Sequence, residues 1–141
     1  MPNSFRSIGL IARATSDVGN HLFQKNDLQN SQFIYLMRIN EHPGITQTEL
    51  ASQLHVDPST CLRVIRRLVT HDYVDRQTDS ANKKARPLVA TAKGQAIYPE
   101  LKAYEQQILT IGTAGLSEGE KLILEELLAK VAHNIRSYQT K

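Results

Sequence analysis

Three arginines within one short segment are the residues of this chain best suited to contacting an anion. Arg63, Arg66 and Arg67 lie between Pro58 and Thr70, a segment that contains no Asp or Glu. A guanidinium group can bind a phosphate, or it can donate two hydrogen bonds to O6 and N7 of guanine. Because exposed arginines on a helix are often only solvated, their function depends on the elements that surround them.

The elements around these arginines predict a helix-turn-helix. Thr46 and Glu49 have the spacing of a capping box, which predicts a short helix that runs to about Leu54. A tight connection follows at His55, and Asp57 before a proline predicts the start of a second helix, which carries the arginines. Two short helices joined in this way have the geometry of a helix-turn-helix.

A basic hairpin is expected directly after the second helix. Residues 73–76 and 87–90 have the composition of short strands, and the polar segment 77–86 would connect them. From residue 76 to residue 86 there is one acid, Asp79, against four basic residues, which are Arg76, Lys83, Lys84 and Arg86. This hairpin predicts a winged helix, whose finger suits a phosphate backbone or an electronegative minor groove.

The combination of arginine-rich helix and basic hairpin predicts contact with duplex DNA. Small hydroxyl side chains near a helix N-terminus permit close approach to phosphates and bases, and the free amides of that terminus can bind phosphate oxygens. The residues expected to contact DNA are Thr46, Ser59, Thr60, Arg63, Arg66, Arg67, Arg76, Lys83, Lys84 and Arg86.

The two ends of the chain predict long amphipathic helices. Residues 5–25, 93–113 and 117–138 each repeat apolar residues at alternating spacings of three and four. A small winged-helix lobe cannot cover three such seams, and leaving them in water would cost several kcal/mol. We therefore expect a homodimer whose interface includes Ile8, Ile11, Val18, Leu22, Ile108, Ile111, Leu128, Val131 and Ile135.

These elements together give a mainly α-helical fold with a small β-hairpin wing, a winged helix-turn-helix flanked by long dimerisation helices. A further helix at about 33–39 would end at the stop signal His42-Pro43-Gly44. We expect residues 31–91 to form the DNA-binding lobe, with 1–30 and 92–141 as the helical dimerisation region.

Composition limits the other function classes. The chain has 141 residues, a net charge of +3 and one cysteine, which excludes an intramolecular disulfide framework. No secretory signal or membrane span is evident, so we expect a cytoplasmic protein that is associated with the nucleoid when bound to DNA. The histidines lack the spacing of a metal site, and no phosphate loop or nucleophile elbow is present, so neither a cofactor, a metal nor catalysis is expected.

The helix-turn-helix and wing resemble those of the MarR family of transcription regulators. The resemblance lies in the run 46–68, in Tyr-Val-Asp-Arg at 73–76 and in Leu-Val-Ala-Thr-Ala-Lys-Gly at 88–94. The order of the expected helices extends it over nearly the whole chain. Three positions depart from the family pattern: Asn82-Lys83-Lys84 replaces the usual Asp-x-Arg of the wing, and Asp72 and His55 stand where the family has glycine.

The resemblance implies a triangular homodimer whose two recognition helices occupy successive major grooves of a pseudo-palindromic operator. Repression by covering a promoter is the expected mode of action. Many such proteins bind small aromatic anions, and a ligand cleft here would include Tyr35, Met37 and Tyr104, with plain core packing as an equal alternative. Some sense oxidants through cysteine, but the place of Cys61 on the apolar stripe of its helix favours a buried core residue.

One rival function from another class stays open at this point. A winged-helix protein-interaction adaptor without specific DNA binding would present the same basic face to an acidic partner protein. The two hypotheses differ in salt dependence, because displacement of counterions from DNA gives a steep salt slope and a preferred sequence.

Overall fold

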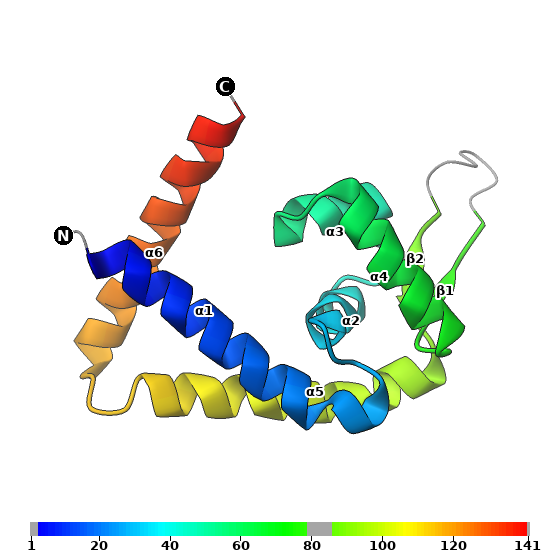
Figure 1. Ribbon diagram of the computed structural model, residues 1–141, viewed down its shortest axis with the longest axis horizontal. Helices are drawn as coiled ribbons and strands as arrows, with labels where there is room; N and C mark the ends of the chain where they lie inside the picture. The colour runs from blue at the N-terminus through cyan, green and yellow to red at the C-terminus, as the bar shows by residue number, and fades with distance from the viewer. Residues whose placement is uncertain (1–2, 79–85, 141) are drawn as a thin grey trace. The chain divides into compact units, whose positions relative to one another are not determined.

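The computed structural model describes residues 3–78 and 86–140, and its elements are shown in Figure 1. Their order is α1 (Asn3–Leu22), a 3-10 turn η1 (Gln24–Asn26), α2 (Gln32–Glu41), α3 (Gln47–Leu54), α4 (Pro58–Thr70), β1 (Val74–Arg76), β2 (Leu88–Ala90), α5 (Ala92–Gly112) and α6 (Glu118–Gln139). The expected fold, mainly helical with one antiparallel hairpin, is confirmed. Lys83 and Lys84 lie outside the described residues, and none of the described helices is both long and apolar enough to span a membrane.

The chain divides into two compact units, Met1–Glu105 and Gln106–Lys141. The first contains α1 to α4, the hairpin and most of α5; the second contains the end of α5 and all of α6. These units are defined by how compactly each part of the chain packs. The sequence instead predicted a DNA-binding lobe at 31–91 and a dimerisation region at 1–30 and 92–141, and that division by function stays a prediction.

The core of the first unit forms around α4. Its buried residues Cys61, Val64, Ile65 and Leu68 recur at spacings of three, one and three, which places them on one side of the helix. This stripe packs against α2, α3 and β1. The largest fully buried side chains of these neighbours are Leu36, Met37, Ile39, Leu50 and Val74. The opposite side of α4 is therefore left to face outward.

The hairpin is held at its base by a contact that the sequence pattern did not predict. β1 and β2 pair antiparallel, with Val74 opposite Ala90 and Arg76 opposite Leu88. Ile45, in the connection between α2 and α3, forms an isolated bridge to Leu88. The Leu88 amide donates to the Ile45 carbonyl at 2.9 Å and the Gly44 amide donates to the Leu88 carbonyl at 2.8 Å. The segment after α2, in which the sequence indicated only the end of a helix, thus also fixes β2 to the lobe.

The two residues that replace family glycines adopt the conformation that glycine favours. His55 ends α3 with φ 56 and Asp72 follows α4 with φ 62, both in the left-handed region. At His55 the backbone turns so that α4 can begin three residues later. Both turns therefore keep a left-handed backbone although neither position carries glycine.

Close approaches join α1 and α5 to the lobe. A Cβ on Gly19 would lie 2.3 Å from Cζ of Phe33, so α1 can approach α2 only through a glycine there. The ring of Tyr104 on α5 packs edge-on against Phe23 and Phe33 at centroid distances of 5.7 and 5.5 Å. Its hydroxyl donates to the carbonyl of Thr15 on α1. These contacts fix α1 against α5 and leave the seam of α1 exposed.

Candidate nucleic-acid interface

The outward side of α4 carries the residues predicted to contact DNA. Ser59, Arg63, Arg66 and Thr70 are exposed, and at 100° per residue they lie opposite the buried stripe. Of the described residues, none places an acidic side chain in an ion pair with these arginines. Because these arginines form no ion pair with an acidic side chain, they can donate hydrogen bonds to phosphate oxygens or to the acceptor edges of bases.

The start of α4 keeps its amides available to an anion. Asp57 occupies the N-cap position with an extended backbone, as expected, but its side chain accepts no hydrogen bond from a helix amide. It instead accepts a hydrogen bond from the Ser59 hydroxyl. Pro58 at the first helical position needs no partner for its nitrogen. The first-turn amides, which have no partner within a helix, lie beside the small residues Ser59 and Thr60.

The structure gives Thr46 a structural role in α3. The Glu49 amide donates to its Oγ1 at 3.2 Å, and its own amide donates to Oε2 of Glu49 at 3.4 Å, which is the reciprocal pair of a capping box. The hydroxyl proton of Thr46 is still available for donation. Its predicted contact with DNA therefore remains a prediction, alongside a role in fixing the first helix of the helix-turn-helix.

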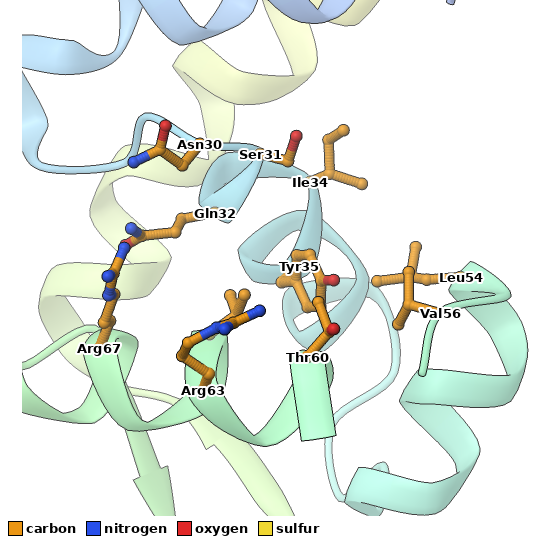
Figure 2. Close-up of a pocket in the computed structure, with 11 residues that line it drawn as sticks. Asn30, Ser31, Gln32, Ile34, Tyr35, Leu54, Val56, Thr60, Arg63 and Arg67 are labelled. Atoms are coloured by element: carbon orange, nitrogen blue, oxygen red, sulfur yellow. The ribbon is translucent and has the colours of Figure 1, made fainter. Parts of the chain in front are cut away.

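Thr60 and Arg67 face a different direction from Ser59 and Arg66. They line a cavity of about 530 Å³ between α2 and α4, which Arg63 also lines. Figure 2 shows Arg63 and Arg67 extending from α4 toward Gln32 and Tyr35 of α2. The predicted contact residues of α4 are therefore brought together on one helix but divided between its outward side and this cavity.

The cavity combines an apolar wall with polar groups, one of which has no hydrogen-bond partner. Its apolar lining comes from Ile34, Leu54, Val56 and Val64. Gln32 is 3% exposed, and its Oε1 has no hydrogen-bond partner. Burial raises the pKa of Tyr35 above its usual value. Arg63 and Arg67 also line the cavity, so a small molecule with an apolar body and an acidic group would match its apolar wall and its arginines.

Of the three residues predicted for a ligand cleft, only Tyr35 lines this cavity. Met37 is buried in the core at 2% exposure, and Tyr104 packs against Phe23. Sequence reasoning also missed Gln32. Its signal was a polar residue directly before the apolar run Phe-Ile-Tyr-Leu-Met, at a position that helical periodicity buries.

At the base of the wing, Arg76 and Arg86 lie near Arg66 of α4. Burial and the positive charges of Arg86 and Arg66 lower the pKa of Arg76. Arg86 is exposed and Arg76 is partly buried. The structure thus brings together three of the predicted contact residues from the helix and the hairpin.

The helices outside the winged-helix lobe expose most of the residues predicted for dimerisation. In the first unit, Ile8, Ile11, Val18 and Leu22 on α1 are all exposed. In the second unit, none of the described residues 106–140 is buried. Ile111, Leu128 and Ile135 are exposed there, while Ile108 and Val131 are partly covered.

Comparison with known proteins identifies this arrangement. A sequence model of the MarR family matches residues 28–85. The uncharacterized HTH-type transcriptional regulator YybA of Bacillus subtilis (strain 168) is 36% identical over 135 residues, covering 96% of this chain and 90% of its own. This chain belongs to the MarR family.

Solved structures of MarR-family regulators have the same fold. A MarR protein from Peptoclostridium difficile is 30% identical, with a TM-score of 0.94 over 99% of this chain and 92% of its own. A putative MarR family transcriptional regulator from Listeria monocytogenes, solved in complex with a 26mer DNA, is 36% identical. It gives a TM-score of 0.93 over 96% of this chain and 90% of its own. The protein is accordingly a winged-helix transcriptional regulator.

In the part of the chain that the structure describes, residues that could hold a metal are not gathered together. Among residues 3–78 and 86–140, no group of three or more His, Cys, Asp or Glu side chains has the arrangement of a metal site. The single cysteine, Cys61, is fully buried, and its Sγ lies 3.8 Å from the Gln47 carbonyl.

The buried thiol of Cys61 should react slowly with alkylating reagents. Burial raises its pKa from 9.0 to about 11. At neutral pH the reactive thiolate should be about a hundredfold rarer than in a free cysteine, before access is considered. We expect iodoacetamide to label the folded protein far more slowly than the protein unfolded in urea. Rapid labelling of the native state would contradict the assignment of Cys61 to the core.

Proposed function

We propose that this MarR-family regulator acts as a homodimer that binds a pseudo-palindromic duplex DNA sequence and represses transcription by covering a promoter. The observation that carries the proposal is the outward side of α4, where arginines without acidic partners follow a helix N-terminus. The Listeria monocytogenes relative solved with a 26mer DNA supports this role. Such a dimer shares the cytoplasm with DNA and needs no cofactor.

Contacts with bases and with the backbone would come from different parts of the lobe. Ser59 and Arg63 lie in the N-terminal half of α4, the part of a recognition helix that reaches base edges in the major groove. Arg66, Arg76 and Arg86 lie nearer the hairpin, where phosphates pass between the grooves. Lys83 and Lys84 of the wing tip are proposed as further phosphate contacts.

The exposed apolar helices support the dimer. The accessible surface of the chain is 9823 Å², about a third more than a folded monomer of this mass is expected to expose. Isologous pairing of the two copies through α1, α5 and α6 would cover the apolar residues named above. It would also present two copies of α4 to successive major grooves, roughly 34 Å apart.

Replacing Arg63 with alanine should reduce preference for the correct sequence. A duplex selected from a random library by the wild-type dimer serves as the operator. If Arg63 reads a base, Arg63→Ala should weaken operator binding by about 1–3 kcal/mol and change random-sequence binding less. Fluorescence anisotropy at two or more salt concentrations measures both. Lys130→Ala, on α6, removes one positive charge outside the proposed interface and is the matched control.

The same titration separates this proposal from a protein-interaction adaptor. A DNA-binding dimer should lose affinity steeply as salt rises and should prefer its selected duplex over other sequences. A shallow salt slope with no preferred sequence would instead favour the adaptor.

A charge placed on the exposed apolar side of α6 should dissociate the dimer. Ile135 is 48% exposed in the single chain and is proposed to pack against the partner copy. Ile135→Lys should raise the dimer dissociation constant by about a hundredfold or more, because a lysine would have to be buried without a counter-charge. Sedimentation equilibrium measures this constant. Asn134→Lys adds the same charge one residue away and should leave the dimer dissociation constant nearly unchanged. Equal effects of the two variants on this constant would refute the proposed interface.

We further propose that a small aromatic anion occupies the cavity between α2 and α4 and releases the DNA. Arg63 and Arg67 would pair with its acidic group, while Ile34 and Val56 would contact its apolar ring. Because Arg63 belongs both to the cavity and to the exposed side of α4, a ligand that holds Arg63 withdraws it from the DNA.

Benzoate, a simple aromatic carboxylate, can test this cavity directly. Arg67→Gln should weaken its binding by about tenfold or more, because an ionised hydrogen bond is lost. Arg66→Gln removes an equal charge from a residue that does not line the cavity, and it should change the affinity little. Isothermal titration calorimetry measures both. If benzoate binds and the two variants weaken it equally, the ligand does not occupy this cavity.

A further inference from the structure

Three arginines converge where the hairpin meets α4. Arg76 ends β1 directly opposite Leu88 of β2, and the Gln77 amide continues the ladder by donating to the Pro87 carbonyl at 2.7 Å. Arg86 lies two residues before β2 begins, and its positive charge acts on Arg76. Arg66 reaches this place from α4, which packs against β1.

This cluster has positive charge without an acidic partner in the described part of the chain. Nη2 of Arg76 is buried and has no hydrogen-bond partner. The ion pairs found among residues 3–78 and 86–140 involve other basic residues, namely Arg38, Lys121 and Lys130. Asp75 is the adjacent acid, but alternation along β1 directs its side chain to the other face.

Such a group is costly unless an anion joins it. Burial and two neighbouring positive charges disfavour the charged form of Arg76, which lowers its pKa. Arg76 is partly buried, and its Nη2 atom lacks the hydrogen-bond acceptor that a buried donor needs, so an anion bound here would stabilise the folded state.

We propose that Arg66, Arg76 and Arg86 form one binding site for a single phosphate group of the DNA backbone, held jointly by α4 and the hairpin. The inference rests on the proposed function and makes it more specific. A phosphate fits better than a base, because its oxygens accept hydrogen bonds from several guanidinium groups at once. A guanine edge offers two acceptors, which one arginine already occupies. The site therefore supplies affinity and fixes the wing relative to α4, but it reads no sequence.

A single shared phosphate makes the three arginines act as a unit. Neutralising that phosphate should weaken DNA binding by the wild-type protein. The same modification should not change the affinity of a variant that has lost the site. Removing a second arginine should add less than removing the first, because contacts in one network are not additive.

The test replaces the phosphates of the selected operator, one at a time, with uncharged methylphosphonate. We expect the wild-type dimer to lose about tenfold in affinity at one phosphate in each half-site. Arg76→Gln and Arg86→Gln should each bind the unmodified operator more weakly, and each should lose the response at that same phosphate. The double variant should be weaker than either single variant by less than the product of their separate effects.

Two features of the design keep the outcome clear. Arg86 is exposed, so Arg86→Gln tests the site even if Arg76→Gln fails to fold. Arg67→Gln removes an arginine of α4 that faces the cavity instead, and it should keep the full response at that phosphate.

The inference is overturned if Arg76→Gln and Arg86→Gln respond to every methylphosphonate as the wild type does, or if they lose their responses at different phosphates. DNA binding itself would survive either result. If the selection yields no preferred duplex, the proposed function fails first, and the phosphate site fails with it.

Discussion

The winged-helix lobe depends on the burial of one side of α4. Cys61, Ile65 and Leu68 are 0% exposed and join α4 to α2, α3 and β1. This packing removes apolar surface from water, and it determines which residues of the same helix must face outward. A recognition surface built on a packed helix keeps its geometry, because shifting any arginine would require repacking the core beneath it.

The second constraint is the fastening of the hairpin to the lobe. Ile45 and Gly44 hydrogen-bond to Leu88 at the base of β2, and the Thr91 amide donates to the Tyr73 carbonyl at 3.0 Å. A Cβ on Gly94 would lie 2.2 Å from the same carbonyl, so the start of α5 closely approaches the backbone just before β1. The base of the wing is therefore fixed by backbone hydrogen bonds. Because Arg76 and Arg86 belong to this fixed base, they are held near Arg66 of α4.

The lobe leaves polar groups unpaired at the places where a ligand is proposed to bind. In the described part of the chain, two of the four buried side-chain atoms without hydrogen-bond partners lie at such places, namely Nη2 of Arg76 at the wing base and Oε1 of Gln32 beside the α2–α4 cavity; the other two belong to Asn26 and Gln29. Buried polar groups are ordinarily satisfied, so each such exception costs stability in the free protein. At Arg76 the cost is consistent with a regulator whose stability rises when a DNA phosphate supplies the missing acceptor.

The sequence by itself determined the order of the elements, because that order is encoded locally. The capping box at Thr46, the Asp-Pro start of α4 and the apolar periodicities of α1, α5 and α6 each act within a few residues. Only the tertiary structure decided which elements meet. It placed Arg67 in a cavity and not on the outward side of α4, buried Met37 in the core, and brought Arg66 to the hairpin. Those outcomes depend on contacts between residues far apart in the chain. The spacing of residues along one element predicts which side of that helix or strand each residue occupies, but it does not predict which other element packs against that side.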